Sequence, residues 1–393
     1  MRRRLIPLML ALLVPLALAV GLWAGGHPRV LPGFLRDAFV GDSQAQVYQE
    51  VLDRIDADFY KEVDEDDVAS KSLAAAVDSL KDPFSRYIDP DTKAEFDAST
   101  TGQFEGVGMN VEEIKRGLKV LDVFDDGPAD KAGIRAGDLI VAVDGESLAG
   151  TASEDATTQI KGKAGTSVAL TIVTDGKRRV EDVERAAISV PVSEKRMETE
   201  DGMKIGYVTL QQFTSGAHGF VSANIDSLLD DGAKGIVFDL RHNGGGLLEE
   251  GVFTASLFIP DGLIVSTGGR NRPTRRFNAS GDSIDTDIPV AVLVDGATAS
   301  ASEIVTGALQ DLERATVVGV QTFGKGVFQE IEDLPNGGAL DITVGEYFTP
   351  DGRNLGPSDG KRGLTPDVKG EDDPDTKPDE ALEEALDVVA AEL

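Results

Sequence analysis

The middle of the chain alternates between continuous apolar runs and segments with helical periodicity. GIVFDL, PVAVLV and ATVVGV are apolar at almost every position, whereas the segments between them repeat apolar residues at helical spacing. Continuous apolar runs are typical of parallel strands that are covered on both faces. Residues 204–320 therefore predict an α/β unit built on a mainly parallel sheet, within a core that spans 192–370.

The segments on either side of this unit have other patterns. Residues 43–82 repeat apolar positions at helical spacing, so we expect an N-terminal helical segment over 35–100, used for self-association. Residues 101–185 contain short β-like runs between Gly-rich turns, which predicts a β module. Residues 263–287 predict an irregular or hairpin insertion in the core. The acidic run near the end predicts a solvated tail over 371–393, in which residues 378–393 form a short amphipathic helix.

The first residues of the chain predict export. MRRR precedes about twenty apolar residues, a pattern typical of an export signal whose positive end stays inside. Residues 1–28 are therefore a signal anchor or a signal peptide, and ALA at 17–19 is a possible cleavage site. Because a run of this length spans a bilayer, we favour a single-pass membrane anchor, with the remainder of the chain outside the cytoplasm.

Charge and composition exclude several classes of function. The chain has 38 Lys and Arg against 69 Asp and Glu, a formal net charge of -31. This balance argues against nucleic acid as a partner, because binding a phosphate backbone requires a basic surface. There is no cysteine, which excludes disulfides and thiol chemistry. The three histidines, His27, His218 and His242, are too few for an imidazole-based metal site, so we expect neither metal nor cofactor.

The β module carries a peptide-binding pattern. In FEGVGMNV, Gly106 and Gly108 flank a bend at the start of a strand, where successive N–H groups can hold a carboxylate. The run GPADKAGIRAGDLIVAVDGESL follows, and it resembles a PDZ domain. The resemblance implies that the loop of Glu105, Gly106, Val107 and Gly108 binds the carboxyl terminus of a peptide. A module with only a packing role is the alternative.

A glycine-rich turn follows one of the predicted core strands. In GIVFDLRHNGGGLLEEG, the three consecutive glycines Gly244–Gly246 come directly after the strand. Ligands of open α/β sheets bind at this edge, and glycines let the backbone approach them closely. A phosphate site and an oxyanion hole both fit, although neither GK[ST] nor GxGxxG is present to support a nucleotide. A tight turn alone remains the alternative.

Two serines stand where a predicted helix begins. VDGATASASEIVTGALQD places Ser300 and Ser302 directly after a buried strand. SASE fits a capping box, with Ser300 as the N-cap and Glu303 three residues later, so helix capping is one interpretation. The other is a nucleophile, because the helix N-terminus lies at the ligand-binding edge of the sheet and favours negative charge.

A serine nucleophile needs a base, and Lys325 in QTFGKGVFQEI is the best candidate. If a strand includes Lys325 and Gln329, both side chains lie on one face, where Gln329 can orient the amine. A lysine acts as a base only when it is neutral, which burial favours. A solvated turn lysine is the alternative, and His242 leaves a Ser-His-Asp arrangement open.

Four motifs together resemble one family. DGATASASEIVTGALQD, VVGVQTFGKGVFQ, DLRHNGGGLL and YFTPDGR with GLTPDV are similar to the carboxyl-terminal processing peptidases, which are S41-type serine peptidases with a PDZ domain. The resemblance covers about residues 40–370. It implies an α/β fold with a crotonase-like peptidase core, an inserted PDZ domain and an N-terminal helical segment. It also implies an endopeptidase that recognises protein or peptide substrates through their carboxyl terminus.

The resemblance also implies roles for individual residues. By position, Ser300 is the nucleophile, Lys325 the general base and Gln329 the residue that orients the lysine. The oxyanion donors are the backbone N–H groups of Gly245 and Ala301. The chain departs from the family at the residue before Gly245, a glycine where Pro or Ser is common. The alternatives are an inert PDZ scaffold or chaperone and a crotonase-like acyl-CoA enzyme, and a homo-oligomer is possible in each case.

Overall fold

The computed structural model describes residues 43–124, 126–357, 362–372 and 379–393. The export segment predicted at 1–28 lies outside these residues. Within the described ranges, none of the helices combines the length and the apolarity that a bilayer span requires. The chain divides into two units, Met1–Pro83 and Phe84–Leu393.

The described part of the first unit is helical, as the apolar periodicity predicts. It consists of α3 (Ser43–Asp58) and α4 (Glu65–Asp78). Asp64 caps α4, because its carboxylate accepts the N–H groups of Asp66 and Asp67. The predicted helical segment extended too far, however. Residues 86–88 form a strand of the second unit, and three residues are too few to show a periodicity that sequence analysis can detect.

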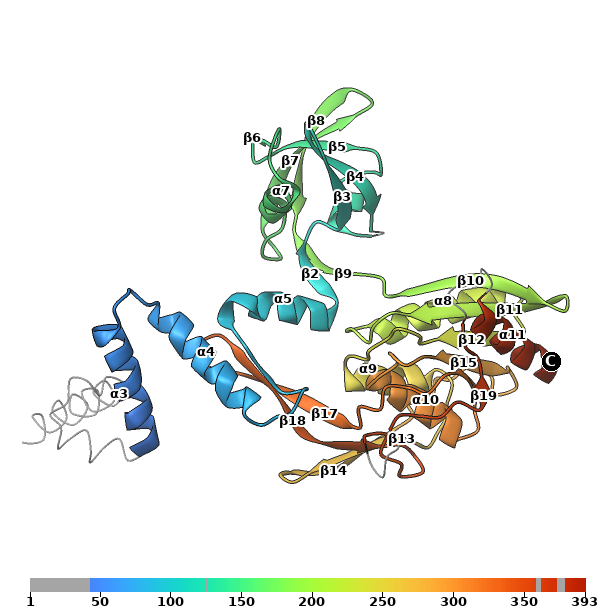
Figure 1. The fold of residues 1–393 in the computed structure, drawn as a ribbon. Helices are drawn as coiled ribbons and strands as arrows, with labels where there is room; N and C mark the ends of the chain where they lie inside the picture. The colour runs from blue at the N-terminus through green and yellow to red at the C-terminus, as the bar shows by residue number, and fades with distance from the viewer. Residues whose placement is uncertain (1–42, 125, 358–361, 373–378) are drawn as a thin grey trace, which may run out of the picture. The chain divides into compact units, whose positions relative to one another are not determined.

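The β module is an antiparallel sheet with two short helices. Its strand order is β3-β4-β5-β7-β8, with β6 paired to β5, and β3 lies at one edge. A two-stranded ribbon of β2 and β9 joins the module to the rest of the unit (Figure 1). The elements are β2 (Gln103–Gly106), β3 (Met109–Ile114), β4 (Gly117–Val123), α6 (Pro128–Lys131), β5 (Leu139–Val143), β6 (Glu146–Ser147), α7 (Ser153–Ile160), β7 (Ser167–Thr174), β8 (Lys177–Glu184) and β9 (Ala186–Ser189).

The core contains the parallel sheet predicted from its continuous apolar runs. The order is β10-β11-β12-β15-β16-β19, and only the edge pair β10–β11 is antiparallel. The strands are β10 (Ser193–Glu200), β11 (Met203–Leu210), β12 (Gly235–Asp239), β15 (Val290–Val294), β16 (Thr316–Gly319) and β19 (Val368–Lys369). Every residue of β12 and β15 is buried, because helices cover both faces of the sheet.

The two faces of this sheet have separate apolar clusters. One cluster packs against α8 (Ala217–Asp230), α9 (Leu248–Ser256) and α10 (Ala301–Asp311). The other packs against α11 (Glu380–Glu392) alone among the described helices. The predicted amphipathic helix over 378–393 is confirmed, but the prediction of a solvated tail is wrong for these residues. Its buried stripe, which includes Leu382, Leu386 and Val389, lies on the sheet, while its acidic residues face outward.

A second antiparallel sheet extends beside the core. Its order is β1-β18-β13-β14, and β17 pairs with β18. The hairpin of β13 and β14 falls in the segment that predicted an irregular or hairpin insertion. The elements are β1 (Arg86–Ile88), β13 (Leu263–Gly269), β14 (Arg272–Asn278), β17 (Val327–Asp333) and β18 (Ala339–Phe348). One further helix, α5 (Pro90–Thr101), lies between β1 and the ribbon.

Candidate active site

Ser300 is the N-cap residue of α10 and has a strained backbone. Its φ of 58° and ψ of -118° lie in a region that residues with a side chain rarely adopt. Its N–H donates to the carboxylate of Glu303 at 3.1 Å, as the capping interpretation predicts. Ser302 is different, because it is fully buried and its hydroxyl donates to the carbonyl of Asn243 at 2.9 Å. Of the two serines, only Ser300 lines the cavity described below.

The glycine-rich loop lies directly against Ser300. A Cβ added to Gly245 would stand 2.6 Å from the Ser300 Cβ and 2.9 Å from the Ala301 nitrogen, so only glycine fits. The φ of Gly245 is also positive, at 103°. In this structure its N–H donates to the side-chain oxygen of Asn243 at 2.8 Å. The Ala301 N–H is the first of α10 and has no acceptor within the helix.

Lys325 lies in the loop before β17, not within the strand as the alternation argument assumed. Strict alternation also fails within β17, because a register shift follows Phe328. The consecutive residues Phe328 and Gln329 therefore both line the same cavity as Lys325. The Lys325 Nζ lies 5.2 Å from the ring centre of Phe84, within cation–π range. The Gln329 amide donates to the hydroxyl of Thr343 at 2.9 Å.

Glu303 joins the serine and the lysine, a role that sequence analysis missed. Its side chain is fully buried and accepts five hydrogen bonds. The donors are Thr322 Oγ1 (2.6 Å), Gly324 N (2.7 Å), Lys325 N (3.0 Å), Ser300 N (3.1 Å) and Tyr347 Oη (3.1 Å). Burial, and then the charge of Glu303, raise the pKa of Tyr347, which keeps this phenol protonated as a donor. The one sequence signal for this role was that Glu303 is a single acidic residue in the otherwise apolar first turns of the helix.

These residues surround one cavity of about 320 Å³. Ser300, Ala301, Lys325 and Gln329 line it together. Much of the remaining wall is apolar and comes from α5, α9, α10, β17 and β18. Its apolar members include Phe96, Leu248, Ile304, Phe328, Ile331 and Tyr347. A hydroxyl at a helix N-terminus, an amine and the first backbone N–H of that helix are groups that acyl transfer can use.

Two regions of the chain match known families. The sequence profile of Peptidase family S41 matches residues 204–369, and that of the PDZ domain matches 95–173. The chain is 37% identical over 328 residues to the carboxy-terminal-processing protease of Bartonella bacilliformis, covering 82% of this chain and 74% of that protein. It is 36% identical over 294 residues to the carboxyl-terminal-processing protease of Synechocystis, covering 74% and 68%.

The chain belongs to peptidase family S41. It is a serine-type peptidase with a PDZ domain. A solved structure of the photosystem II D1 C-terminal processing protease is 30% identical and covers 89% of this chain and 91% of that one, with a TM-score of 0.49.

The two histidines within the described residues of this S41 peptidase lie away from Ser300. His242 pairs with Asp295 at 2.7 Å, but it is 88% exposed and lines a different cavity from Ser300. The Nδ1 of His218 lies 2.7 Å from the buried carboxylate of Glu250. The same carboxylate also accepts the backbone N–H of His218 at the start of α8. The structure therefore does not support a Ser-His-Asp arrangement built on either residue.

The predicted carboxylate-binding loop lies between β2 and β3 of the PDZ domain. Gly106 ends β2, and Gly108, with a φ of 77°, precedes β3. The carbonyl groups of Val107 and Gly108 accept N–H groups from α6 and from the residue after β4. Glu105 accepts two N–H groups of the loop that follows α7. With its carbonyls engaged in the module, the loop can turn N–H groups outward.

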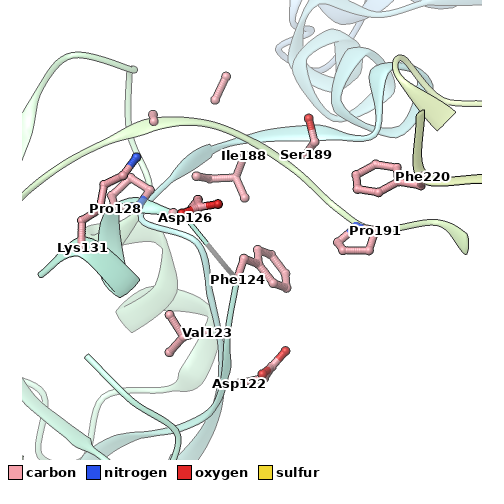
Figure 2. A pocket seen from close by; sticks show the side chains of 13 residues that line it. Asp122, Val123, Phe124, Asp126, Pro128, Lys131, Ile188, Ser189, Pro191 and Phe220 are labelled. Atoms are coloured by element: carbon pink, nitrogen blue, oxygen red, sulfur yellow. The ribbon is translucent and has the colours of Figure 1, made fainter. Parts of the chain in front are cut away.

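A second cavity, of about 670 Å³, lies beside the PDZ domain and does not include Ser300 or Lys325. Figure 2 shows that its walls come from the end of β4 and the start of α6, from β9, and from Phe220 of α8. Its lining therefore includes residues of the PDZ domain, of the ribbon and of the core.

Proposed function

We propose that this S41 peptidase is an exported carboxyl-terminal processing endopeptidase that uses Ser300 as nucleophile and Lys325 as general base. The proposal is carried by their shared cavity and by the buried carboxylate of Glu303, which accepts the backbone N–H groups of both residues. One buried carboxylate thus sets the position of the nucleophile relative to the base. Gln329, which lines the same cavity, orients the amine of the lysine.

The proposed reaction follows from these positions. Neutral Lys325 takes the proton of the Ser300 hydroxyl, whose oxygen attacks the peptide carbonyl. The N–H groups of Ala301 and Gly245 stabilise the resulting oxyanion. Lys325 then protonates the leaving amine, and a water activated by the same lysine releases the acyl group from Ser300.

The donor on Gly245 must change its partner for this reaction. Its N–H donates to Asn243 in the structure, so a substrate oxygen has to replace that acceptor. We propose that the structure represents a resting arrangement, and that substrate binding turns the Gly245 N–H toward the cavity. The turn involves only a few backbone torsions, and glycine has a wide choice of them.

We propose that the PDZ domain selects the substrate by its carboxyl terminus. The edge position of β3 supports this assignment, because a peptide can pair with an edge strand and extend the sheet. The bend from Glu105 to Gly108 lies at the start of that strand, where the last carboxylate of such a peptide would be. The two relatives are both named carboxyl-terminal processing proteases, which agrees with substrates recognised at their carboxyl terminus.

Three further features belong to the proposal. The apolar N-terminal stretch supports export, with the peptidase outside the cytoplasm and attached to the membrane or released by cleavage. The alternation of parallel strands and helices supports a crotonase-like core. The helices of residues 43–83 are the segment that we propose for a homo-oligomer.

Two substitutions test the assignment. Ser300→Ala and Lys325→Ala should each abolish cleavage of an unstructured reporter peptide with a free carboxyl terminus. Ser302→Ala is the matched control, since its hydroxyl is buried and bonded to a carbonyl, and it should keep most of the activity. A serine-directed phosphonate should label wild type but not Ser300→Ala. Cleavage by folded Ser300→Ala would refute the proposal, and a wild type that neither cleaves nor labels would indicate an inert PDZ scaffold.

A further inference from the structure

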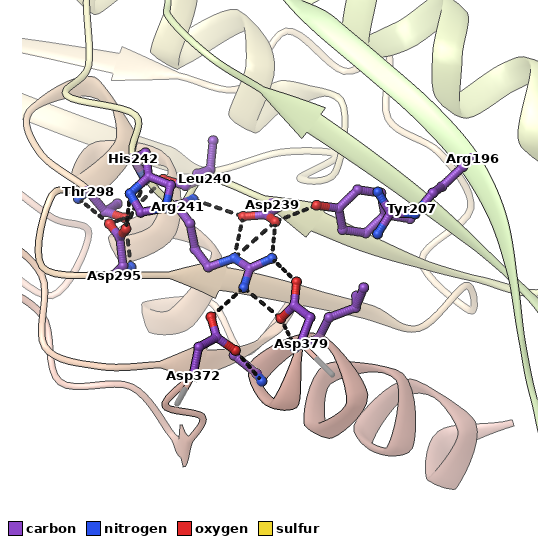
Figure 3. Close-up of polar contacts among 12 residues, drawn as sticks. Arg196, Tyr207, Asp239, Leu240, Arg241, His242, Asp295, Thr298, Asp372 and Asp379 are labelled. Carbon is purple, nitrogen blue, oxygen red and sulfur yellow. Dashed lines mark hydrogen bonds and ion pairs between the residues drawn. The ribbon is translucent and has the colours of Figure 1, made fainter. Parts of the chain in front are cut away.

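Arg241 lies at the point where the last parallel strand before the glycine-rich loop ends. It follows β12 by two residues and precedes Gly245 by four. Its side chain is only 12% exposed. Figure 3 shows its guanidinium surrounded by the carboxylates of Asp239, Asp372 and Asp379.

All five N–H groups of the guanidinium have carboxylate acceptors. Asp239 accepts from Nε at 3.0 Å and from Nη2 at 2.7 Å. Asp379 accepts from Nη2 and Nη1, each at 2.8 Å, and Asp372 accepts from Nη1 at 2.9 Å. Burial lowers the pKa of Arg241, but the hydrogen bonds to Asp379 and Asp239 outweigh it and raise the pKa overall. The guanidinium is therefore charged, and these carboxylates balance its positive charge.

Asp372 and Asp379, which we call the C-terminal clamp, are more than 130 residues from Arg241 in sequence. Each carboxylate also fixes the start of α11. Asp379 accepts the N–H of Leu382, and Asp372 accepts the N–H of Ala381, both at 2.9 Å. Because α11 packs on the sheet through its apolar stripe, the clamp holds Arg241 against a rigid element.

The residues after Arg241 transmit this constraint to the loop. The His242 N–H donates to Asp295 at 3.0 Å. The next residue, Asn243, is fully buried and accepts the Gly245 N–H. A displacement of Arg241 would therefore move the backbone that carries the oxyanion donor, and small displacements of such a donor strongly reduce catalysis.

We propose that Arg241 is a positioning residue for the Gly245 oxyanion donor, and that the C-terminal clamp completes the active site by holding it. The inference rests on the proposed function, because it assumes the oxyanion role of Gly245. Without the clamp, the buried guanidinium keeps only Asp239 and turns toward solvent to satisfy its other N–H groups. The strand end and the glycine-rich loop then lose their fixed relation to Ser300.

The test compares Asp379→Asn and Asp372→Asn/Asp379→Asn with the control Asp387→Asn. Asn is as good an N-cap as Asp, so the start of α11 is preserved while the charged contact to Arg241 is lost. Asp387 lies on the exposed face of the same helix, and its replacement removes the same charge without touching Arg241. We measure kcat and KM with the reporter peptide and the inhibition constant of a peptide aldehyde, whose adduct with serine carries an oxyanion.

The double variant should lower kcat by about tenfold with KM within about twofold, and should weaken aldehyde inhibition by a similar factor. Asp379→Asn should have a smaller effect in the same direction, and Asp387→Asn should match wild type. A folded double variant with wild-type kcat and aldehyde inhibition overturns the inference. If the double variant fails to fold, the same two measurements on Asp379→Asn decide: unchanged values overturn the inference, and a joint reduction supports it.

The two proposals fail in different ways. If folded Ser300→Ala still cleaves, the proposed function is wrong, and the positioning role of Arg241 falls with it. If Ser300→Ala is inactive and the clamp variants equal wild type, the proposed function stands and only the positioning role is wrong. A rise of KM in the clamp variants without a change in kcat would also contradict the positioning role of Arg241, because it indicates weaker substrate binding instead.

Discussion

Glu303→Gln should lower both the stability of the fold and kcat, because the Glu303 carboxylate holds the backbone of Ser300 and Lys325. The wild-type carboxylate accepts hydrogen bonds only, two at Oε1 and three at Oε2. Glutamine replaces one oxygen with an NH₂ group, which cannot accept. The less costly orientation places NH₂ at the Oε1 position. There it faces the Gly324 N–H and the Thr322 hydroxyl, so the bonds from these two donors are lost or reversed.

The magnitude follows from those two bonds. A hydrogen bond to a charged group contributes about 1.5–3 kcal/mol, so the substitution should lower the free energy of unfolding by about 3–6 kcal/mol. The N–H groups of Ser300 and Lys325 would still reach the amide oxygen, but as weaker bonds to a neutral acceptor. Because the bonds that hold nucleophile and base to this common side chain are then weaker, kcat should fall by about 10- to 100-fold with a small change in KM.

The assay combines urea unfolding with cleavage kinetics below the unfolding transition. Glu250→Gln is the matched control, since Glu250 is also buried but accepts the N–H groups of Gly216 and His218 instead. It should lose stability and keep its kcat. Wild-type kcat in folded Glu303→Gln, or an equal loss of kcat in the Glu250 variant, would show that the shared carboxylate does not position Ser300 and Lys325.

Two other predictions concern Gly245 and Tyr207. Gly245→Ala should reduce cleavage at least about 100-fold, because its Cβ would overlap Ser300. The control Gly244→Ala, with nothing within 4 Å of the added Cβ, should remain active, and equal activities of the two variants would contradict the packing argument. Burial, and then Asp239, raise the pKa of Tyr207 to about 12, so its contribution to stability is complete below pH about 10 and is lost as pH rises through 12. Urea unfolding at pH 9 to 12 should therefore show a steeper loss in wild type than in Tyr207→Phe, and parallel curves would contradict it.

The motifs predicted which residues meet, but not how they are held. Short-range patterns identified the N-cap position of Ser300, the glycine loop and the PDZ domain, because capping, turns and close approach depend on a few adjacent residues. The alternation argument for Lys325 and Gln329 failed because β17 begins after Lys325 and because its register shift depends on the partner strand, which local sequence does not show. For the same reason the role of Glu303 was missed. Apart from the N-cap residue Ser300, its hydrogen-bond donors lie 19 to 44 residues away in sequence.

The amino-acid order alone was enough for the α/β architecture and the family, since continuous apolar runs, helical periodicity and long motifs are properties of neighbouring residues. It predicted the amphipathic C-terminal helix but not its position, because acidic composition suggested a solvated tail and the apolar stripe instead packs on the sheet. It was equally insufficient for Arg241, whose partners Asp372 and Asp379 are brought close only by folding. Burial and long-range ion pairing depend on which surfaces meet, and a linear pattern does not specify that.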